Sequence, residues 1–308
     1  MTKILQNMQA KYSPTLIANI LLFFTMIAWG TSFISTKIAI AEVPPFTIAF
    51  IRLAITSCIL WPIFRKYEPT TRLDQKGKSL FAITGLLGIT IYFCFENIGI
   101  KLTTASNASL ITSVTPILSI TLNMLFFKAR LSLCELLGVL LGIGGSYLTI
   151  TANGALDTTS DNFLGNVFVI GSMISWSFYT IFSKKQQSNN SDLAIVTYQT
   201  IFGTLFLIPF AATEYHQWHL FSFSALLQII YLAVICSAAC YFLYIYVLKI
   251  LDVTLTTIYL NLVPITGIIT GYLVLDERIL PIQLLGGIMI LAAILVANLD
   301  KLLKFSRS

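Results

Sequence analysis

The sequence predicts an all-α integral membrane protein with ten transmembrane helices, arranged as two inverted-topology five-helix repeats. Three observations predict this fold class. Of the 308 residues, 56% are hydrophobic and only 10% are charged, and the mean hydropathy is +0.85. The apolar residues gather in long stretches, and the two halves of the chain repeat one another. A soluble domain carries about 25% charged residues, so the composition excludes a soluble enzyme, a disordered chain and a secreted disulfide scaffold.

The apolar stretches are long, continuous and rich in Leu and Ile, which favours helices over the short alternating strands of a membrane barrel. A span needs roughly 20 apolar residues, so the chain holds about ten spans joined by short loops. This leaves no room for a soluble catalytic or nucleotide-binding domain. The predicted spans are 16–36, 46–64, 79–97, 104–126, 131–151, 164–183, 193–213, 224–247, 253–275 and 279–298.

The chain divides into two halves of five spans each. The first apolar stretch is too long for the hydrophobic part of a signal peptide, so we interpret it as a retained first helix. The predicted organisation is a cytoplasmic tail (1–15), a first repeat (16–151), an outer linker (152–163), a second repeat (164–299) and a cytoplasmic tail (300–308).

The basic residues predict the orientation of the helices. With ten spans, fifteen of the 19 lysines and arginines fall on the side of the N-terminus. Only Lys37, Lys101 and Arg278 fall on the other side, and Arg52 lies within a span. Cytoplasmic loops carry an excess of Lys and Arg, so both termini are predicted to be cytoplasmic. An error of one span would abolish this asymmetry, so the charge bias also supports ten spans.

An internal repeat relates the two halves of the chain. At a shift of 147 or 148 residues, the aligned pairs are Trp29 with Trp176, Lys37 with Lys184, Pro62 with Pro209, Lys101 with Lys249, Pro116 with Pro264 and Arg130 with Arg278. The constant order of these pairs indicates a duplication. Because each repeat has an odd number of spans, the second copy enters the membrane from the opposite side. Such inverted pairs bind their substrate near the midplane, between the repeats.

Polar residues predict a cavity between the repeats. One face of the fourth span combines serines with Pro116, and the equivalent face of the ninth span combines Thr254, Thr257 and Asn261 with Pro264. A proline frees a backbone carbonyl, which lipid tolerates only beside protein or water. The alternative is close packing through small polar residues. The predicted cavity contacts are Trp29, Asn107, Ser113, Trp176, Tyr179, Tyr244 and Asn261, with helix kinks at Pro116 and Pro264.

Two charged residues lie at similar depth within the second and third predicted spans, Arg52 and Glu96. A charge near the bilayer centre costs at least about 2.5–3.5 kcal/mol, so it is usually paired or functional. Two interpretations stay open. The residues form a structural ion pair, or they serve coupling and gating, in which Glu96 binds a coupled proton or Arg52 binds a substrate carboxylate.

Other motifs are weak. His216 and His219 are too few ligands for a stable metal site, so no metal is predicted, and no cofactor motif is present in the sequence. The basic residues border the membrane, which suits anionic lipid and not nucleic acid. The pairs Gly138–Gly142 and Gly267–Gly271 fit close helix packing within one chain or in a homodimer.

These features resemble the EamA-type branch of the drug/metabolite transporter superfamily. The resemblance rests on the ten spans in two inverted repeats and on four motifs: Trp29-Gly30-Thr31-Ser32-Phe33, Pro44-Pro45 followed by Arg52, the two proline-bearing segments, and Gly138 after Glu135 with its echo at Gly286. It implies a bacterial inner-membrane carrier that exports amino acids or related metabolites by alternating access. It also implies a central cavity formed by the first, third, fourth, sixth, eighth and ninth spans. The second repeat departs from the pattern at Ser177 and Gln199.

The predicted function is secondary-active or facilitative transport of small organic solutes, with amino acids or related metabolites as the expected cargo and protons as the candidate coupling ion. One alternative is a proton-coupled exporter of drugs or aromatic compounds. An alternative from another class is a transport-inactive membrane scaffold or enzyme subunit. The duplicated polar face argues against a scaffold, which has no need for it.

Overall fold

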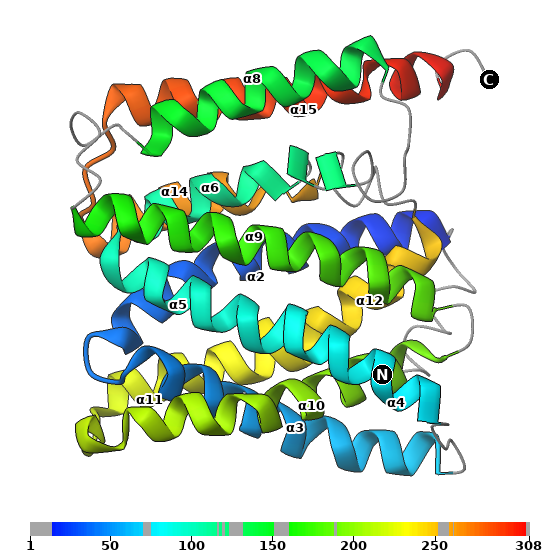
Figure 1. Cartoon of the computed structure of the whole chain (residues 1–308), viewed down its shortest axis with the longest axis vertical. Coiled ribbons are helices and arrows are strands. Elements are labelled where there is room, and N and C mark those ends of the chain that lie inside the picture. The colour runs from blue at the N-terminus through cyan, green and yellow to red at the C-terminus, as the bar shows by residue number, and fades with distance from the viewer. Residues whose placement is uncertain are drawn as a thin grey trace.

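The computed structural model describes residues 14–69, 75–115, 117–118, 121–122, 132–150, 160–187, 190–251, 259–260 and 262–305 (Figure 1). Within these residues, six helical segments are long and apolar enough to cross a membrane: Pro14–Ile40, Pro45–Tyr67, Gly77–Leu102, Asp161–Gln186, Asp192–Thr213 and Phe223–Ile250. Three shorter apolar helical segments accompany them: Leu136–Gly145, Leu262–Leu275 and Pro281–Ala293.

The helices follow the predicted order of spans. In the first repeat they are α2 (Pro14–Ile40), α3 (Pro45–Tyr67), α4 (Gln75–Gly85), the π-helical segment η1 (Leu86–Ile91), α5 (Tyr92–Leu102), α6 (Ala105–Ile111), η2 (Thr112–Val114) and α8 (Leu133–Ile150). In the second they are α9 (Asp161–Gln186), α10 (Asp192–Thr213), η3 (Tyr215–Gln217), α11 (Phe223–Tyr231), the π-helical segment η4 (Leu232–Ala239), α12 (Cys240–Ile250), α14 (Leu262–Leu275) and α15 (Pro281–Phe305).

Helix pairing follows a two-fold relation between the repeats. Three helices of the first repeat pack against their own counterparts: α3 against α10, α6 against α14, and α8 against α15. Other contacts cross between different positions of the two repeats: α2 packs against α12, and α5 packs against α9. In Figure 1, α8 and α15 lie side by side along one edge of the molecule. This pairing is what a two-fold axis between inverted repeats produces, and the axis runs between α2, α5, α9 and α12.

Hydroxyl side chains begin several of the helices. Ser160, Ser191 and Ser222 precede α9, α10 and α11, and each side-chain oxygen accepts a hydrogen bond from the main-chain N–H three residues later. The α3 helix begins with Pro45, whose missing N–H would have no helical partner there. These caps satisfy donors at the helix ends that lipid cannot satisfy.

The third span is longer than predicted. The sequence predicts an end near residue 97, but α5 continues to Leu102. The ammonium group of Lys37 explains the extension, since its Nζ donates to the carbonyl of Ile100 (2.7 Å) and so satisfies an acceptor in the last helical turn. The charge of Lys101 lies in that same turn and is exposed.

Candidate functional site

A small cavity lies where the two repeats meet, near the middle of α2 and α9. Its volume is about 50 Å³. That is room for one or two water molecules, whereas ligand pockets usually measure roughly 300–1,000 Å³. The lining residues are Trp29, Ser32, Phe33, Arg52, Tyr92, Phe93, Glu96, Thr112, Thr115, Met173, Trp176, Tyr241, Leu260 and Val263.

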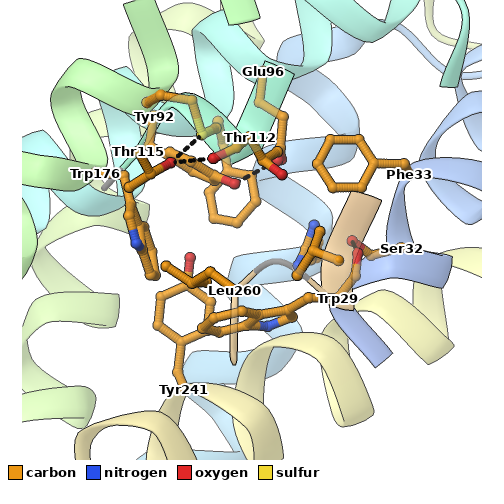
Figure 2. Close-up of a pocket in the computed structure, with 14 residues that line it drawn as sticks. Trp29, Ser32, Phe33, Tyr92, Glu96, Thr112, Thr115, Trp176, Tyr241 and Leu260 are labelled. Carbon is orange, nitrogen blue, oxygen red and sulfur yellow. Dashed lines mark hydrogen bonds between the residues drawn. The ribbon is translucent and has the colours of Figure 1, made fainter. Parts of the chain in front are cut away.

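Aromatic rings form much of the cavity wall (Figure 2). The rings of Trp29 and Trp176 meet edge to face, with centroids 5.5 Å apart and planes at 89°. Tyr92 and Tyr241 extend this cluster, with centroids 5.2 Å and 5.7 Å from that of Trp176. The indole N–H of Trp29 donates to the carbonyl of Cys236 (3.0 Å), which fixes the ring on α2 against η4. The cluster is therefore a preformed apolar surface with fixed ring edges.

Arg52 supplies a buried cation to the cavity. Only 3% of its surface is exposed. Its Nε donates to the hydroxyl of Ser237 in η4 (2.7 Å), and its guanidinium carbon lies 4.4 Å from the centroid of the Phe93 ring. The terminal guanidinium nitrogens hydrogen-bond none of the residues that the structure describes. Within the described part of the chain, they therefore remain as donors at the cavity wall.

Glu96 supplies a buried carboxylate on the same wall. It is 4% exposed, and its Oε1 accepts a hydrogen bond from the Tyr92 hydroxyl (2.5 Å). Figure 2 shows Glu96 and Tyr92 on one side of the cavity and Trp29 and Tyr241 on the other. The guanidinium of Arg52 acts on Glu96 electrostatically, but among the described residues the two side chains share no hydrogen bond. The cavity thus holds one positive and one negative group, and the described residues leave part of the hydrogen-bonding capacity of each unused.

The cavity lies on the two-fold axis between the repeats. Four pairs of equivalent positions line it together: Trp29 with Trp176, Phe93 with Tyr241, Thr112 with Leu260, and Thr115 with Val263. The charged positions are not duplicated. Arg52 corresponds to Gln199 and Glu96 to Tyr244. Both cavity charges therefore come from the first repeat, and the second repeat supplies a mostly apolar wall.

Four of the residues singled out from the sequence meet at the cavity: Trp29, Trp176, Arg52 and Glu96. Tyr179 and Tyr244 lie behind this lining, packed on Trp176 with ring centroids 4.9 Å and 5.6 Å away.

The remaining predicted residues lie elsewhere in the chain. Ser113 is buried in η2. Asn107 is also buried, and its Nδ2 donates to Oδ1 of Asn166 (2.6 Å), so it joins α6 to α9 outside the cavity lining. Pro264 lies in the first turn of α14. Pro116 and Asn261 fall outside the described residues.

The sequence pattern missed two π-helical segments at equivalent positions of the repeats, η1 and η4. A π turn leaves main-chain groups without regular helical partners, and such turns are frequent at functional sites. Side chains of neighbouring helices supply donors to these carbonyls. Ser175 donates to the carbonyl of Leu87 in η1 (2.7 Å), and Thr56 donates to that of Ala233 in η4 (3.0 Å). Ser237, the partner of Arg52, also lies in η4. The internal repeat relates the two segments, since the 148-residue shift that aligns the repeats superposes η1 on most of η4.

No group of three or more metal-ligating side chains occurs in the part of the chain that the structure describes. Within that part, the polar chemistry of the cavity consists of one guanidinium, one carboxylate, and the hydroxyls of tyrosine, serine and threonine. This arrangement has the means to bind and orient a small solute, and it holds no evident nucleophile–base pair.

The chain matches one family model and several known proteins. The model of the EamA-like transporter family matches residues 16–151 and 163–299. An "uncharacterized transporter" of Archaeoglobus fulgidus is 29% identical over 90% of this chain and 95% of its own length. A "probable amino-acid metabolite efflux pump" of Escherichia coli (strain K12) is 25% identical over 90% of this chain and 93% of its own length.

Two further similarities agree with that family match. A "probable terminal-alkyne amino-acid exporter" of Streptantibioticus cattleyicolor is 23% identical over 90% of this chain and 92% of its own length. A solved crystal structure shares the fold with a TM-score of 0.65 at 17% identity, and the match covers 92% of this chain and 98% of that one.

Proposed function

Because this chain belongs to the EamA-like transporter family, as a ten-helix membrane protein of two inverted repeats, we propose that it carries amino acids or related metabolites across the membrane by alternating access. The observation that carries this proposal is the central cavity, where Arg52 and Glu96 have hydrogen-bonding capacity that no described residue uses, beside a wall of aromatic rings. Two relatives whose names mention amino-acid export support the choice of cargo.

The chemistry of the cavity fits a zwitterion. The guanidinium of Arg52 matches a carboxylate in charge and in its planar fork of donors. The carboxylate of Glu96 matches an ammonium group. The rings of Trp29 and Trp176 match an apolar or aromatic side chain. A solute with a further side-chain charge would bury that charge without a partner, so neutral amino acids are the preferred cargo.

The small volume of the cavity implies movement during transport. At about 50 Å³ it is too small for an amino acid, so the lining side chains separate before a solute enters. The excess of basic residues on the side of the N-terminus supports cytoplasmic termini. The names of two bacterial relatives support export across a bacterial inner membrane as the direction of net transport.

Glu96 is the candidate coupling group for protons. Its carboxylate lies against Tyr92 and under the influence of Arg52, while Tyr241 faces it across the cavity. A proton on Glu96 would remove the negative charge that attracts the solute's ammonium group. Binding of the proton and of the solute are therefore mutually exclusive, which is the condition for exchange of one against the other.

The proposal is tested by flux in proteoliposomes loaded with labelled amino acids, with and without a pH gradient. We expect saturable efflux of neutral amino acids, strongest for those with aromatic or large apolar side chains. The matched amine and acid analogues, each lacking one charged group, should compete poorly. Trp176→Ala should abolish this flux, whereas Trp61→Ala, which alters a 42% exposed ring on α3, should not.

Three outcomes would change the assignment. Efflux of aromatic compounds that lack a zwitterion, at rates equal to or above those of amino acids, would favour the exporter of drugs or aromatic compounds. Saturable efflux that a pH gradient leaves unchanged would make the protein a facilitator and remove the coupling role of Glu96. No saturable flux of any solute by folded protein would overturn the proposal and favour a scaffold.

A further inference from the structure

Two equivalent lysines make the same contact at the two ends of the molecule. Lys37 lies near the end of α2 and Lys184 near the end of α9, and a shift of 147 residues relates them. The Nζ of Lys37 donates to the carbonyl of Ile100 at the end of α5 (2.7 Å). The Nζ of Lys184 donates to the carbonyl of Leu248 at the end of α12 (2.5 Å). Ile100 and Leu248 are themselves equivalent, at a shift of 148 residues.

These contacts join helix ends that would otherwise lack partners. The last carbonyls of a helix have no N–H within the helix to accept from. A lysine satisfies them and places a positive charge at the negative end of the helix dipole. Breaking the contact exposes an ammonium group and a carbonyl together, so the open arrangement needs water at that end of the molecule.

The two lysines stand at equal distances from the cavity. Lys37 follows Trp29 by eight residues, and Lys184 follows Trp176 by eight residues. At 1.5 Å per residue, each contact lies about 12 Å along its helix from the tryptophan pair, toward opposite faces of the membrane. Both contacts are formed in this structure, and the cavity between them, at about 50 Å³, is too small for an amino acid.

The Lys37 end carries a second clamp. Besides Ile100, Lys37 donates to the carbonyls of Lys101 and Thr103. The carboxylate of Glu277 holds the same turn from the other side, because it accepts from the N–H groups of Ala105 and Ser106 at 2.8 Å each. The turn between α5 and α6 is therefore held from two sides, by Lys37 near the end of α2 and by Glu277 just after α14.

At the opposite end, Lys184 has a neighbour that holds the same helix. The amide of Gln187 donates to the carbonyl of Ile245, one turn before Leu248 in α12. The ends of α9 and α12 are thus joined by two side chains. Each end of the molecule therefore has its own contacts between the first helix and the third span of one repeat: α2 with α5 at one end, and α9 with α12 at the other.

We propose that Lys37 and Lys184 are the two gate latches of this transporter, each of which must release its helix end before the cavity opens to that face. This inference rests on the alternating access of the proposed function, and not on the identity of the solute. When one latch opens, the other stays formed, so the cavity is accessible from one face at a time.

The test measures access to the cavity from each face. Thr112→Cys, introduced with the five native cysteines replaced by alanine, places a thiol in the cavity lining. A membrane-impermeant maleimide is applied to right-side-out and to inverted vesicles, with no solute added. Lys37→Met should raise the ratio of labelling from the Lys37 face to labelling from the Lys184 face by about tenfold, the usual effect of losing a charged hydrogen bond. Lys184→Met should lower this ratio by a similar factor.

The controls are another equivalent pair of lysines, Lys101 and Lys249, which lie at the same two ends and are exposed. Lys101→Met and Lys249→Met each remove one positive charge from the corresponding end without breaking a latch, so both should leave the labelling ratio unchanged. Lys37→Arg should keep most of the native ratio, because it keeps a cationic donor. The double variant Lys37→Met/Lys184→Met should raise labelling from both faces and return the ratio toward that of the parent.

Hydrogen exchange of the protein with its native cysteines provides an independent readout. Lys37→Met should speed amide exchange around the turn between α5 and α6 alone, and Lys184→Met should speed it at the end of α12 alone. The proposal would be overturned if each variant sped amide exchange equally at both faces. It would also be overturned if folded variants kept the labelling ratio of the parent. Absence of amino-acid flux would not overturn it, since neither readout needs a solute.

Discussion

The electrostatic coupling between Arg52 and Glu96 is open to a double-mutant cycle. Arg52→Met removes a charged hydrogen bond to Ser237, about 1.5–3 kcal/mol, and a cation–π contact with Phe93, about 0.5–2 kcal/mol. It also leaves the carboxylate of Glu96 buried without a compensating cation. We therefore expect a loss of about 3–5 kcal/mol in the free energy of unfolding, as for other buried charges that lose a partner.

Glu96→Gln alone should cost less, about 1–2 kcal/mol, since the amide oxygen still accepts from Tyr92. In the double variant neither charge is left uncompensated. Its loss should therefore be smaller than the sum of the single losses by about 1–3 kcal/mol. The assay is denaturant titration of the purified protein in detergent micelles, followed by tryptophan fluorescence.

The matched control is Arg65→Met, which removes an exposed arginine from the same helix. Combined with Glu96→Gln, its effect should be additive within about 0.5 kcal/mol. Additivity of Arg52→Met and Glu96→Gln within that same margin would refute the reasoning, because the two charges would then act independently despite sharing the cavity.

Three further predictions concern coupling, packing and acid stability. Glu96→Gln should weaken solute binding, because the amide carries no charge to attract the solute's ammonium group, and the flux that remains should no longer depend on a pH gradient. Gly203→Ala should destabilise the protein by about 1–3 kcal/mol in detergent unfolding, because the new Cβ would lie 2.3 Å from Cβ of the buried Ile89. Hydrogen bonds from the hydroxyl and the N–H of Ser222 lower the pKa of Glu42, so Glu42→Gln should lower the melting temperature near pH 7, and this difference should vanish as the pH falls through that lowered pKa.

Each of these predictions has its own control or contrary outcome. Loss of both exchange and folding in Glu96→Gln would instead favour a structural role for that carboxylate. Gly144→Ala should be tolerated, since its Cβ would meet only the flexible end of Met289 at 3.3 Å. A constant difference in melting temperature between Glu42→Gln and the native protein at every pH would show that the charge of Glu42 does not matter.

The fold was predictable because lipid restricts the secondary structures that can cross a membrane. A bilayer demands long apolar helices, and the pairs Trp29–Trp176 and Lys37–Lys184 reveal a duplication with an odd number of spans. The family resemblance drawn from the same residues is confirmed by the family model. The cost of burying charge also identified Arg52 and Glu96, and the structure places both at the cavity.

The details of the site depend on helix rotation, which periodicity does not give. A polar stripe shows which residues share a face, but not whether that face meets a cavity or another helix. The amide of Asn107 therefore fitted a cavity on the sequence alone, yet it bonds to Asn166. Glu96 bonds to Tyr92, one turn earlier in the same helix α5, a spacing that the sequence shows, whereas the partner of Arg52, Ser237, lies in the π-helical segment η4. Helix propensities do not reveal such segments.

The most direct test of the account asks whether the transported solute occupies the cavity between Trp29, Arg52 and Glu96. The measurement is the labelling rate of Thr112→Cys by maleimide at increasing concentrations of the amino acid that shows the highest flux. We predict that labelling slows in a saturable manner, with half-protection near the concentration that half-saturates flux, and that Arg52→Met abolishes the protection. Unchanged labelling at saturating solute, in protein that still transports it, would place the solute site elsewhere and contradict the account.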